Sequence, residues 1–242
     1  FPAPYQTEIR SKYSEWSCES IPFKTNEGEQ VAFYFHQNHE QPSDSQSSKT
    51  KLWVCFHGNA SLAMDWAEVH LQDFDTDKDV RFLLVDYPGY GKSEGSPSKK
   101  GIIENGQKAL DTLLESEDLD LENIKLGVVG YSLGAAAGLE FAVREEVEQV
   151  ILFAPFTSML DMGKRTVHWP FYHLVLDRYE NRDRLQELFN QNKVPEITIY
   201  HGLYDDIIPV KMSDELSQLS PEHITFQPAD NAGHQNIVGA VQ

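Results

Sequence analysis

The stretch N-I-K-L-G-V-V-G-Y-S-L-G-A-A-A-G-L-E-F-A-V-R-E-E, residues 123–146, decides how the rest of this chain is interpreted. A short apolar run, residues 124–129, stops at Gly130, and an Ala/Gly-rich segment of helical period begins after Ser132. This pattern predicts a strand, a sharp turn and a helix, with Ser132 in the turn. Gly130 and Gly134 flank the turn where side chains would collide.

In this setting the pattern G-x-S-x-G is typical of a nucleophile elbow, in which the backbone pushes the hydroxyl of Ser132 into the open. The five-residue motif can occur by chance, so its flanks carry the specificity. The small residues 135–138 suit a helix that packs closely on a sheet. The sequence therefore predicts a serine nucleophile at position 132.

Short apolar runs alternate with segments of helical period from residue 51 onward. The runs cover residues 52–56, 82–85, 124–129, 150–154 and 197–200, with a last strand near 224–227. They are continuous, as expected for strands buried on both faces. Between them, one helical stripe comprises Leu62, Trp66 and Val69, and a second covers residues 102–114. We expect an α/β fold, a mostly parallel central sheet with helices on both faces and the site at the C-terminal strand ends.

The segments around this alternation define the domain organisation. Two further strands are expected at about 16–23 and 29–36, and the polar stretch 37–50 is expected to be a surface loop. The segment 157–193 is longer than a single crossover helix requires, and it is rich in large apolar side chains. Both features favour a small helical cap over a helix that only covers the sheet. Because no linker interrupts the chain, 1–242 is predicted to be a single domain.

Composition excludes several classes of partner. The net charge of −18 and the pI of about 4.8 argue against nucleic acid, which needs clustered Lys and Arg. No apolar run approaches the length of a membrane helix, so the chain as given is expected to be soluble. Cys18 and Cys55 are too few for a disulfide framework.

A serine hydroxyl needs a base within hydrogen-bond reach, and elbow enzymes place the acid and the histidine after the serine. His234 follows a glycine in the final loop, where its side chain can reach over the sheet, and it is the expected base. The stretch H-G-L-Y-D-D-I-I-P, residues 201–209, supplies the acid. Its distance from the strand end favours Asp205, with Asp206 as the alternative; His201 is still on or beside its strand.

The tetrahedral intermediate needs two backbone donors. The N–H of Leu133 follows the nucleophile at a helix N-terminus. The loop H-G-N-A-S, residues 57–61, follows an earlier strand, and we assign the second donor to the N–H of Asn59. Gly58 is expected to let the backbone approach the substrate, and His57 is expected to order the loop.

The stretch D-Y-P-G-Y-G-K-S, residues 86–93, imitates a phosphate-binding P-loop. Asp86 replaces the first glycine and would face the phosphates with a negative charge, and Pro88 lacks an N–H. This loop is therefore expected to lie beside the active site without binding a nucleotide. No cofactor and no metal is predicted.

The ordered set H-G-N-A, D-Y-P-G-Y-G-K-S-E-G, G-Y-S-L-G-A-A-A, A-P-F-T-S, H-G-L-Y-D-D-I-I-P and G-H resembles the α/β-hydrolase superfamily over about residues 50–238. It is most similar to a branch of small, often membrane-anchored serine hydrolases that includes depalmitoylating hydrolase-domain proteins and their bacterial and fungal relatives. The resemblance implies an α/β-hydrolase fold with nucleophile Ser132, acid Asp205, base His234 and oxyanion donors Asn59 and Leu133. Family members often carry an N-terminal anchor, so membrane association is expected only through a segment absent from this sequence, and the compartment stays open.

The leading hypothesis is a serine acyl hydrolase that cleaves a carboxylic ester or thioester of a small-molecule or acyl-chain substrate through an acyl-enzyme on Ser132. The alternatives are a serine peptidase or amidase on small peptides and a non-catalytic binding module on the same fold. Cofactor-free perhydrolysis would use the same residues.

Overall fold

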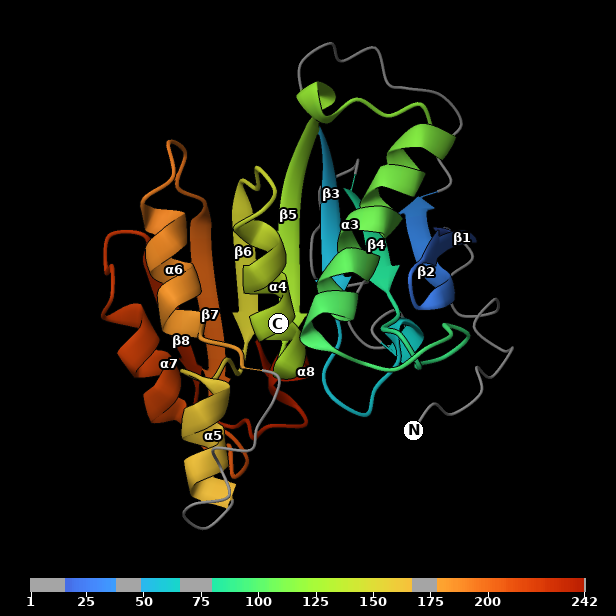
Figure 1. Ribbon diagram of the computed structural model, residues 1–242. Coiled ribbons are helices and arrows are strands. Elements are labelled where there is room, and N and C mark those ends of the chain that lie inside the picture. Colours follow the sequence, from blue (N-terminus) through green and yellow to red (C-terminus); the bar gives the residue numbers. More distant parts are fainter. Residues whose placement is uncertain (1–15, 38–48, 66–79, 167–177, 242) are drawn as a thin grey trace.

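The computed structural model describes residues 16–37, 49–65, 80–166 and 178–241. An eight-stranded sheet runs through the molecule in the order β1-β2-β4-β3-β5-β6-β7-β8 (Figure 1). Its strands are β1 (Trp16–Thr25), β2 (Gly28–Gln37), β3 (Thr50–Phe56), β4 (Val80–Val85), β5 (Ile124–Tyr131), β6 (Gln149–Phe153), β7 (Glu196–Gly202) and β8 (Ile224–Ala229). The helices that follow are α3 (Lys99–Ser116), the 3-10 turn η2 (Leu121–Asn123), α4 (Leu133–Ala142), α5 (Met159–Thr166), α6 (Asn181–Phe189), α7 (Val210–Ser217) and α8 (Ile237–Ala240).

The sheet is parallel from β4 to β8 and antiparallel only at its first edge. β1 pairs antiparallel with β2 and β2 with β4, whereas β3, β5, β6, β7 and β8 each join the sheet in parallel. Parallel strands end at the same edge, so residues that follow them are brought together there. The predicted mostly parallel α/β architecture is confirmed.

The continuous apolar run in β3 serves two cores at once. Leu52, Val54 and Phe56 point into the core under α3, α4, α6 and α7, whereas Trp53 and Cys55 point into the core on the opposite face, which α8 covers (Figure 1). Side chains of successive strand residues lie on opposite faces. A strand covered on both sides must therefore be apolar at every position.

The predicted helix over 102–114 is the central part of α3, which begins three residues earlier and ends two residues later. Ser98 caps it by accepting a hydrogen bond from the N–H of Gly101 at 3.1 Å. Of the other predicted helical stripe, Leu62 is described and buried, whereas Trp66 and Val69 lie outside the described residues. Most of the predicted loop over 37–50 also lies outside them.

The segment predicted as a cap contributes two described helices. α6 packs on α4, and Leu185 and Leu188 are fully buried in the main core, so this helix covers the sheet. α5 lies beyond the C-terminal edge of the sheet (Figure 1). Residues 167–177, with most of the predicted apolar cluster, lie outside the described residues, and the cap stays a prediction.

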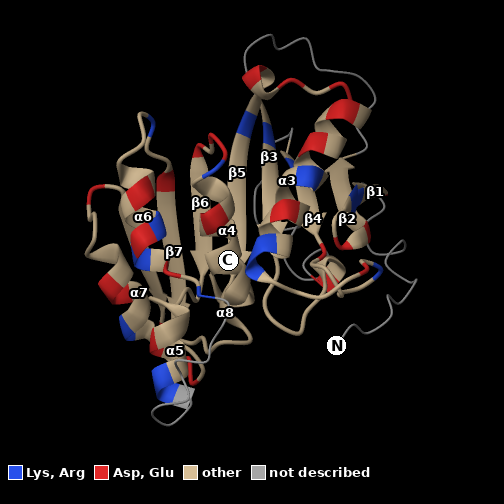
Figure 2. Ribbon diagram, in the orientation of Figure 1, with Lys and Arg blue, Asp and Glu red and all other residues tan. Residues whose placement is uncertain are grey.

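Charged residues sit mainly on the helices and loops, and the strands carry few of them (Figure 2). Acidic and basic residues are interspersed along α3 and α6 in this view, as on an ordinary solvated surface. Among the described residues, no helix combines the length and the hydropathy needed to cross a bilayer.

Candidate active site

Ser132 occupies a strained turn between β5 and α4. Its φ of 56° and ψ of −115° lie where residues with a side chain are rarely found, and its N–H donates to the carbonyl of Phe153 at 2.9 Å. A Cβ on Gly130 would meet the carbonyl oxygen of Gly134, and one on Gly134 would meet the carbonyl oxygen of Phe56. The two glycines are therefore required by backbone packing. This close packing maintains the strained conformation of Ser132 at the C-terminal edge of the sheet.

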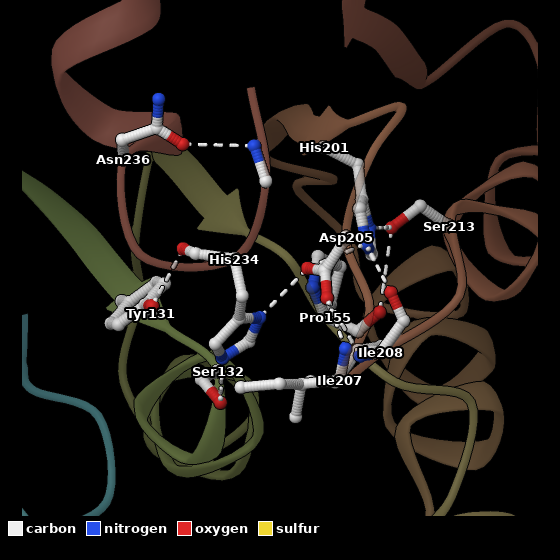
Figure 3. Close-up of polar contacts among 11 residues, drawn as sticks. Tyr131, Ser132, Pro155, His201, Asp205, Ile207, Ile208, Ser213, His234 and Asn236 are labelled. Atoms are coloured by element: carbon white, nitrogen blue, oxygen red, sulfur yellow. Dashed lines mark hydrogen bonds and ion pairs between the residues drawn. The ribbon is translucent and has the colours of Figure 1, made fainter. Parts of the chain in front are cut away.

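His234 reaches Ser132 from the loop between β8 and α8 (Figure 3). Its Nε2 lies 3.1 Å from Oγ of Ser132, 102 residues away along the chain, and its Nδ1 lies 2.7 Å from Oδ2 of Asp205. Because a carboxylate only accepts, Nδ1 carries the hydrogen and Nε2 is left to accept the serine hydroxyl proton. The hydroxyl of Tyr131 donates to the carbonyl oxygen of His234 at 2.7 Å and holds the loop in place.

Asp205 is fixed from two sides. Its Oδ1 accepts the N–H groups of Ile207 and Ile208 at 2.9 and 2.7 Å, and its side chain has no exposed surface. Burial alone would raise the pKa of this carboxyl, but hydrogen bonds from His201, His234 and the N–H of Ile208 hold it well below its usual range. The carboxylate is therefore ionised at neutral pH.

The structure separates the two candidate acids. Asp205 faces His234, whereas its neighbour Asp206 is exposed. The side chain of Asp205 has no exposed surface, whereas Asp206 and the following Ile207 are both exposed. The favoured alternative, Asp205, is the one that lies in contact with the histidine.

His201 is a contact that the sequence argument missed. It lies on β7, as expected from its place in the sequence, and it is fully buried. From there its Nε2 approaches Oδ2 of Asp205 to 3.2 Å. The spacing offered a signal, since His201 precedes the acid by four residues and lies at the buried end of the strand before it.

The predicted oxyanion residues border the same cavity as Ser132. Both Asn59 and Leu133 line it, and Leu133 is the first residue of α4, where the helix dipole favours negative charge. Within the described part of the chain, no hydrogen bond occupies the N–H of either residue. The two donors are therefore available at this edge of the sheet.

Gly58 also has a packing role that was not predicted. A Cβ at Gly58 would lie 2.8 Å from the ring of Tyr131. Glycine is thus required by the packing of the loop on β5. Ala60, two residues further on, has a φ of 58°, so the turn that presents Asn59 is itself strained.

The loop 86–93 supports the oxyanion loop. The Tyr87 hydroxyl donates to the carbonyl oxygen of His57 at 2.6 Å, and the two rings stack with centroids 3.8 Å apart. The Tyr90 hydroxyl donates to Oδ1 of Asn59 at 3.0 Å. Asp86 is buried and accepts the N–H of Ala63 at 2.9 Å, and burial raises the pKa of its carboxyl to about 7.

His57 is held as a neutral ring. Burial lowers the pKa of its imidazole to about 4. Its Nδ1 lies 2.8 Å from the carbonyl oxygen of Gly58, so Nδ1 carries the hydrogen, and Nε2 has no hydrogen-bond partner among the described residues. His57 lies behind the loop, stacked on Tyr87, and does not border the cavity.

A cavity of about 970 Å³ opens above Ser132. One wall is an apolar cluster separate from the two sheet cores, and the cavity is lined by its members Leu133, Phe156, Met159, Met162, Tyr179 and Ile208. The lining also includes the polar residues Asn59, Ser61 and Asp65. Such a volume, mostly apolar with a few polar groups, is typical of a small-molecule site. No group of three or more His, Cys, Asp or Glu in the described ranges could hold a metal ion.

Comparison with known proteins places the chain in a family. The model of the alpha/beta hydrolase family matches residues 53–230. An uncharacterized protein of Mycobacterium tuberculosis is 30% identical over 196 residues, which are 81% of this chain and 66% of that protein. Protein bem46 of Schizosaccharomyces pombe is 27% identical over 198 residues, 79% of this chain and 62% of bem46. The chain thus spans just under two thirds of the length of these relatives.

Solved structures share the fold at low sequence identity. An esterase of Pyrococcus furiosus matches with a TM-score of 0.65 and 19% identity, over 100% of this chain and 90% of the esterase. An acylaminoacyl peptidase of Pyrococcus horikoshii matches with a TM-score of 0.67 and 14% identity, over 94% of this chain and 39% of the peptidase. Together with the family match, these likenesses confirm the fold and the resemblance inferred from the motifs. The chain belongs to the alpha/beta hydrolase family, in the branch that also holds bem46.

Proposed function

We propose that this protein is a serine acyl hydrolase that cleaves a carboxylic ester or thioester through an acyl-enzyme on Ser132. The observation that carries the proposal is the chain of contacts from Asp205 to His234 to Ser132, at 2.7 and 3.1 Å, on a strained elbow beside a cavity. Each contact has the direction that proton transfer needs. A binding module would not require a histidine held in this tautomer against a serine hydroxyl.

In the proposed reaction, Nε2 of His234 takes the hydroxyl proton as Oγ of Ser132 attacks the carbonyl carbon. The N–H groups of Asn59 and Leu133 stabilise the oxyanion. The imidazolium returns its proton to the leaving alcohol or thiol, and the ester oxygen or thioester sulfur departs. Water then attacks the acyl-enzyme with His234 as base again, and Ser132 regains its proton. Asp205 holds the ring and stabilises its charge throughout.

The apolar cluster that lines the cavity supports an apolar acyl group as the substrate's main binding element. Leu133 and Met159 are only half-buried, so their side chains are available to a ligand beside the nucleophile. Burying such a chain contributes about 0.8 kcal/mol per methylene. Methionine side chains adapt to chains of different shape.

Hydrolysis of a series of p-nitrophenyl acyl esters and acyl thioesters, with labelling by a fluorophosphonate probe, tests the proposal. We expect wild-type protein to turn over esters and to be labelled on Ser132, and Ser132→Ala to lose at least a thousandfold in kcat and all labelling. Wild-type turnover by Ser132→Ala would overturn the mechanism. Turnover of peptide amides in preference to esters would favour a peptidase.

A further inference from the structure

His201 links Asp205 to α7 through a buried set of hydrogen bonds (Figure 3). Its Nε2 lies 2.8 Å from the carbonyl oxygen of Ile208 and 3.2 Å from Oδ2 of Asp205. Because both neighbours are acceptors, Nε2 carries a hydrogen.

Ser213 sets the other side of the ring. Its Oγ lies 2.6 Å from Nδ1 of His201 and 3.4 Å from the carbonyl oxygen of Pro155. Because the contact with Nδ1 is the shorter of the two, the Ser213 hydroxyl donates its hydrogen to Nδ1. Nδ1 therefore carries no hydrogen of its own, and the ring is neutral with its hydrogen on Nε2. Ser213 is itself fully buried on α7, so the tautomer is fixed by packed structure and not by solvent.

Asp205 consequently has donors on both oxygens. Two backbone N–H groups hold Oδ1, and Oδ2 is shared between Nδ1 of His234 at 2.7 Å and Nε2 of His201 at 3.2 Å. The backbone donors fix one oxygen only. The hydrogen on Nε2 of His201 lies nearer the carbonyl oxygen of Ile208, and its second contact, to Oδ2, takes part of the negative charge that would otherwise act on His234 alone.

We propose that His201, held in its Nε2–H tautomer by Ser213, is a positioning residue for the Asp205–His234 pair. It aims Oδ2 at His234 and limits how strongly the carboxylate stabilises the His234 imidazolium. The proposal rests on the serine hydrolase function proposed above, because its effect is exerted on the base of that reaction.

The groups around Asp205 give the proposal a distinct pH signature. The titratable side chains that the structure places around it are His201 from β7, His234 from the loop after β8 and Tyr131 from β5. Burial and the charge of Asp205 raise the pKa of Tyr131 to about 12, so its phenol stays neutral. Without the His201 donor, the full charge of the carboxylate acts on His234. The protonated His234 ring is then stabilised more strongly relative to the neutral ring, so the acid limb of the kcat/KM profile moves to higher pH.

The test measures kcat, KM and the pH profile of kcat/KM on an acyl ester for His201→Leu and His201→Gln. We expect His201→Leu to lower kcat about 10- to 100-fold, with KM within about twofold, and to move the acid limb up by about half a pH unit or more. His201→Gln presents an amide N–H where Nε2–H lies, and we expect it to stay within about threefold of wild-type kcat.

Ser213→Ala keeps the test decisive where His201→Leu fails to fold. It removes only the hydroxyl that orients His201, and we expect a loss of about three- to tenfold in kcat with the limb shifted in the same direction. Ser217→Ala is the matched control, because Ser217 lies one turn along α7, is buried and donates to the carbonyl of Asp214 at 2.8 Å. We expect it to match wild type.

Two results would overturn the proposal. The first is folded His201→Leu or Ser213→Ala with wild-type kcat and an unmoved acid limb. The second is equal loss in the Leu and Gln variants without any shift, which would assign His201 to packing alone. Both are distinct from failure of the serine hydrolase function, which would appear as undiminished turnover by Ser132→Ala.

Discussion

Replacing Asp205 by Asn is the most informative single change at this site, because the structure dictates which way the new amide must face. Oδ1 of Asp205 accepts the N–H groups of Ile207 and Ile208. Only the amide oxygen can accept two such donors, so the NH2 group must take the place of Oδ2. It then points at Nδ1 of His234, 2.7 Å away in the wild type.

This arrangement places the histidine in the wrong tautomer. Facing a donor, Nδ1 of His234 must give up its hydrogen, and the ring carries it on Nε2 instead. A hydrogen on Nε2 blocks acceptance of the Ser132 proton. We expect kcat to fall about 10⁴-fold, equivalent to about 5 kcal/mol of transition-state stabilisation, with little change in KM.

The assay is steady-state hydrolysis of a p-nitrophenyl acyl ester, combined with nitrogen-15 NMR of labelled histidine to identify the tautomer. Asp206→Asn is the matched control, since this neighbour carries the same chemical change at an exposed position, and we expect it to stay within about twofold of wild type. Retention of more than about one tenth of kcat by Asp205→Asn would refute the reasoning. So would an equal loss in Asp206→Asn.

Three further predictions concern the elbow, the cavity and the buried ring behind it. Gly134→Ala should destabilise the protein by about 3 kcal/mol or more in urea unfolding, because its Cβ meets the carbonyl oxygen of Phe56; an unchanged midpoint would contradict this. Met162→Trp should cut kcat/KM about tenfold for long acyl esters and leave acetate esters within about twofold; a uniform loss across chain lengths would place the acyl group elsewhere. The pKa of His57, lowered by burial to about 4, means that the unfolded state binds the proton first as pH falls below about 6.5. Between pH 7 and pH 4 the free energy of unfolding should therefore fall by up to about 3 kcal/mol more in the wild type than in His57→Phe. An equal fall in the two proteins would refute this.

Local residue chemistry explains what could be predicted from the sequence. Apolar runs without alternation identify strands covered on both faces, and β3 shows the reason, since its odd and even residues serve different cores. Gly130 and Gly134 could be interpreted in advance because the elbow is a local backbone conformation. The position of His234 in the final loop followed from the common edge at which parallel strands end.

Other features could not be predicted because they depend on where side chains point after folding. The packing of Gly58 against the ring of Tyr131, a residue of β5, is one example. The contact of Tyr90 with Asn59 joins two loops 31 residues apart. In neither case do the neighbouring residues in the sequence indicate the contact.

By itself the sequence determined the alternation of strands and helices, the elbow at Ser132 and the order in which nucleophile, acid and base follow one another. These are properties of local spacing, and local spacing fixes backbone conformation. Only the tertiary structure decided that Asp205 and not Asp206 faces His234, and that His201 contacts the same carboxylate. Those contacts depend on side-chain direction where β7, the loop after it and the final loop meet, and Asp205 and His234 come together there from positions 29 residues apart.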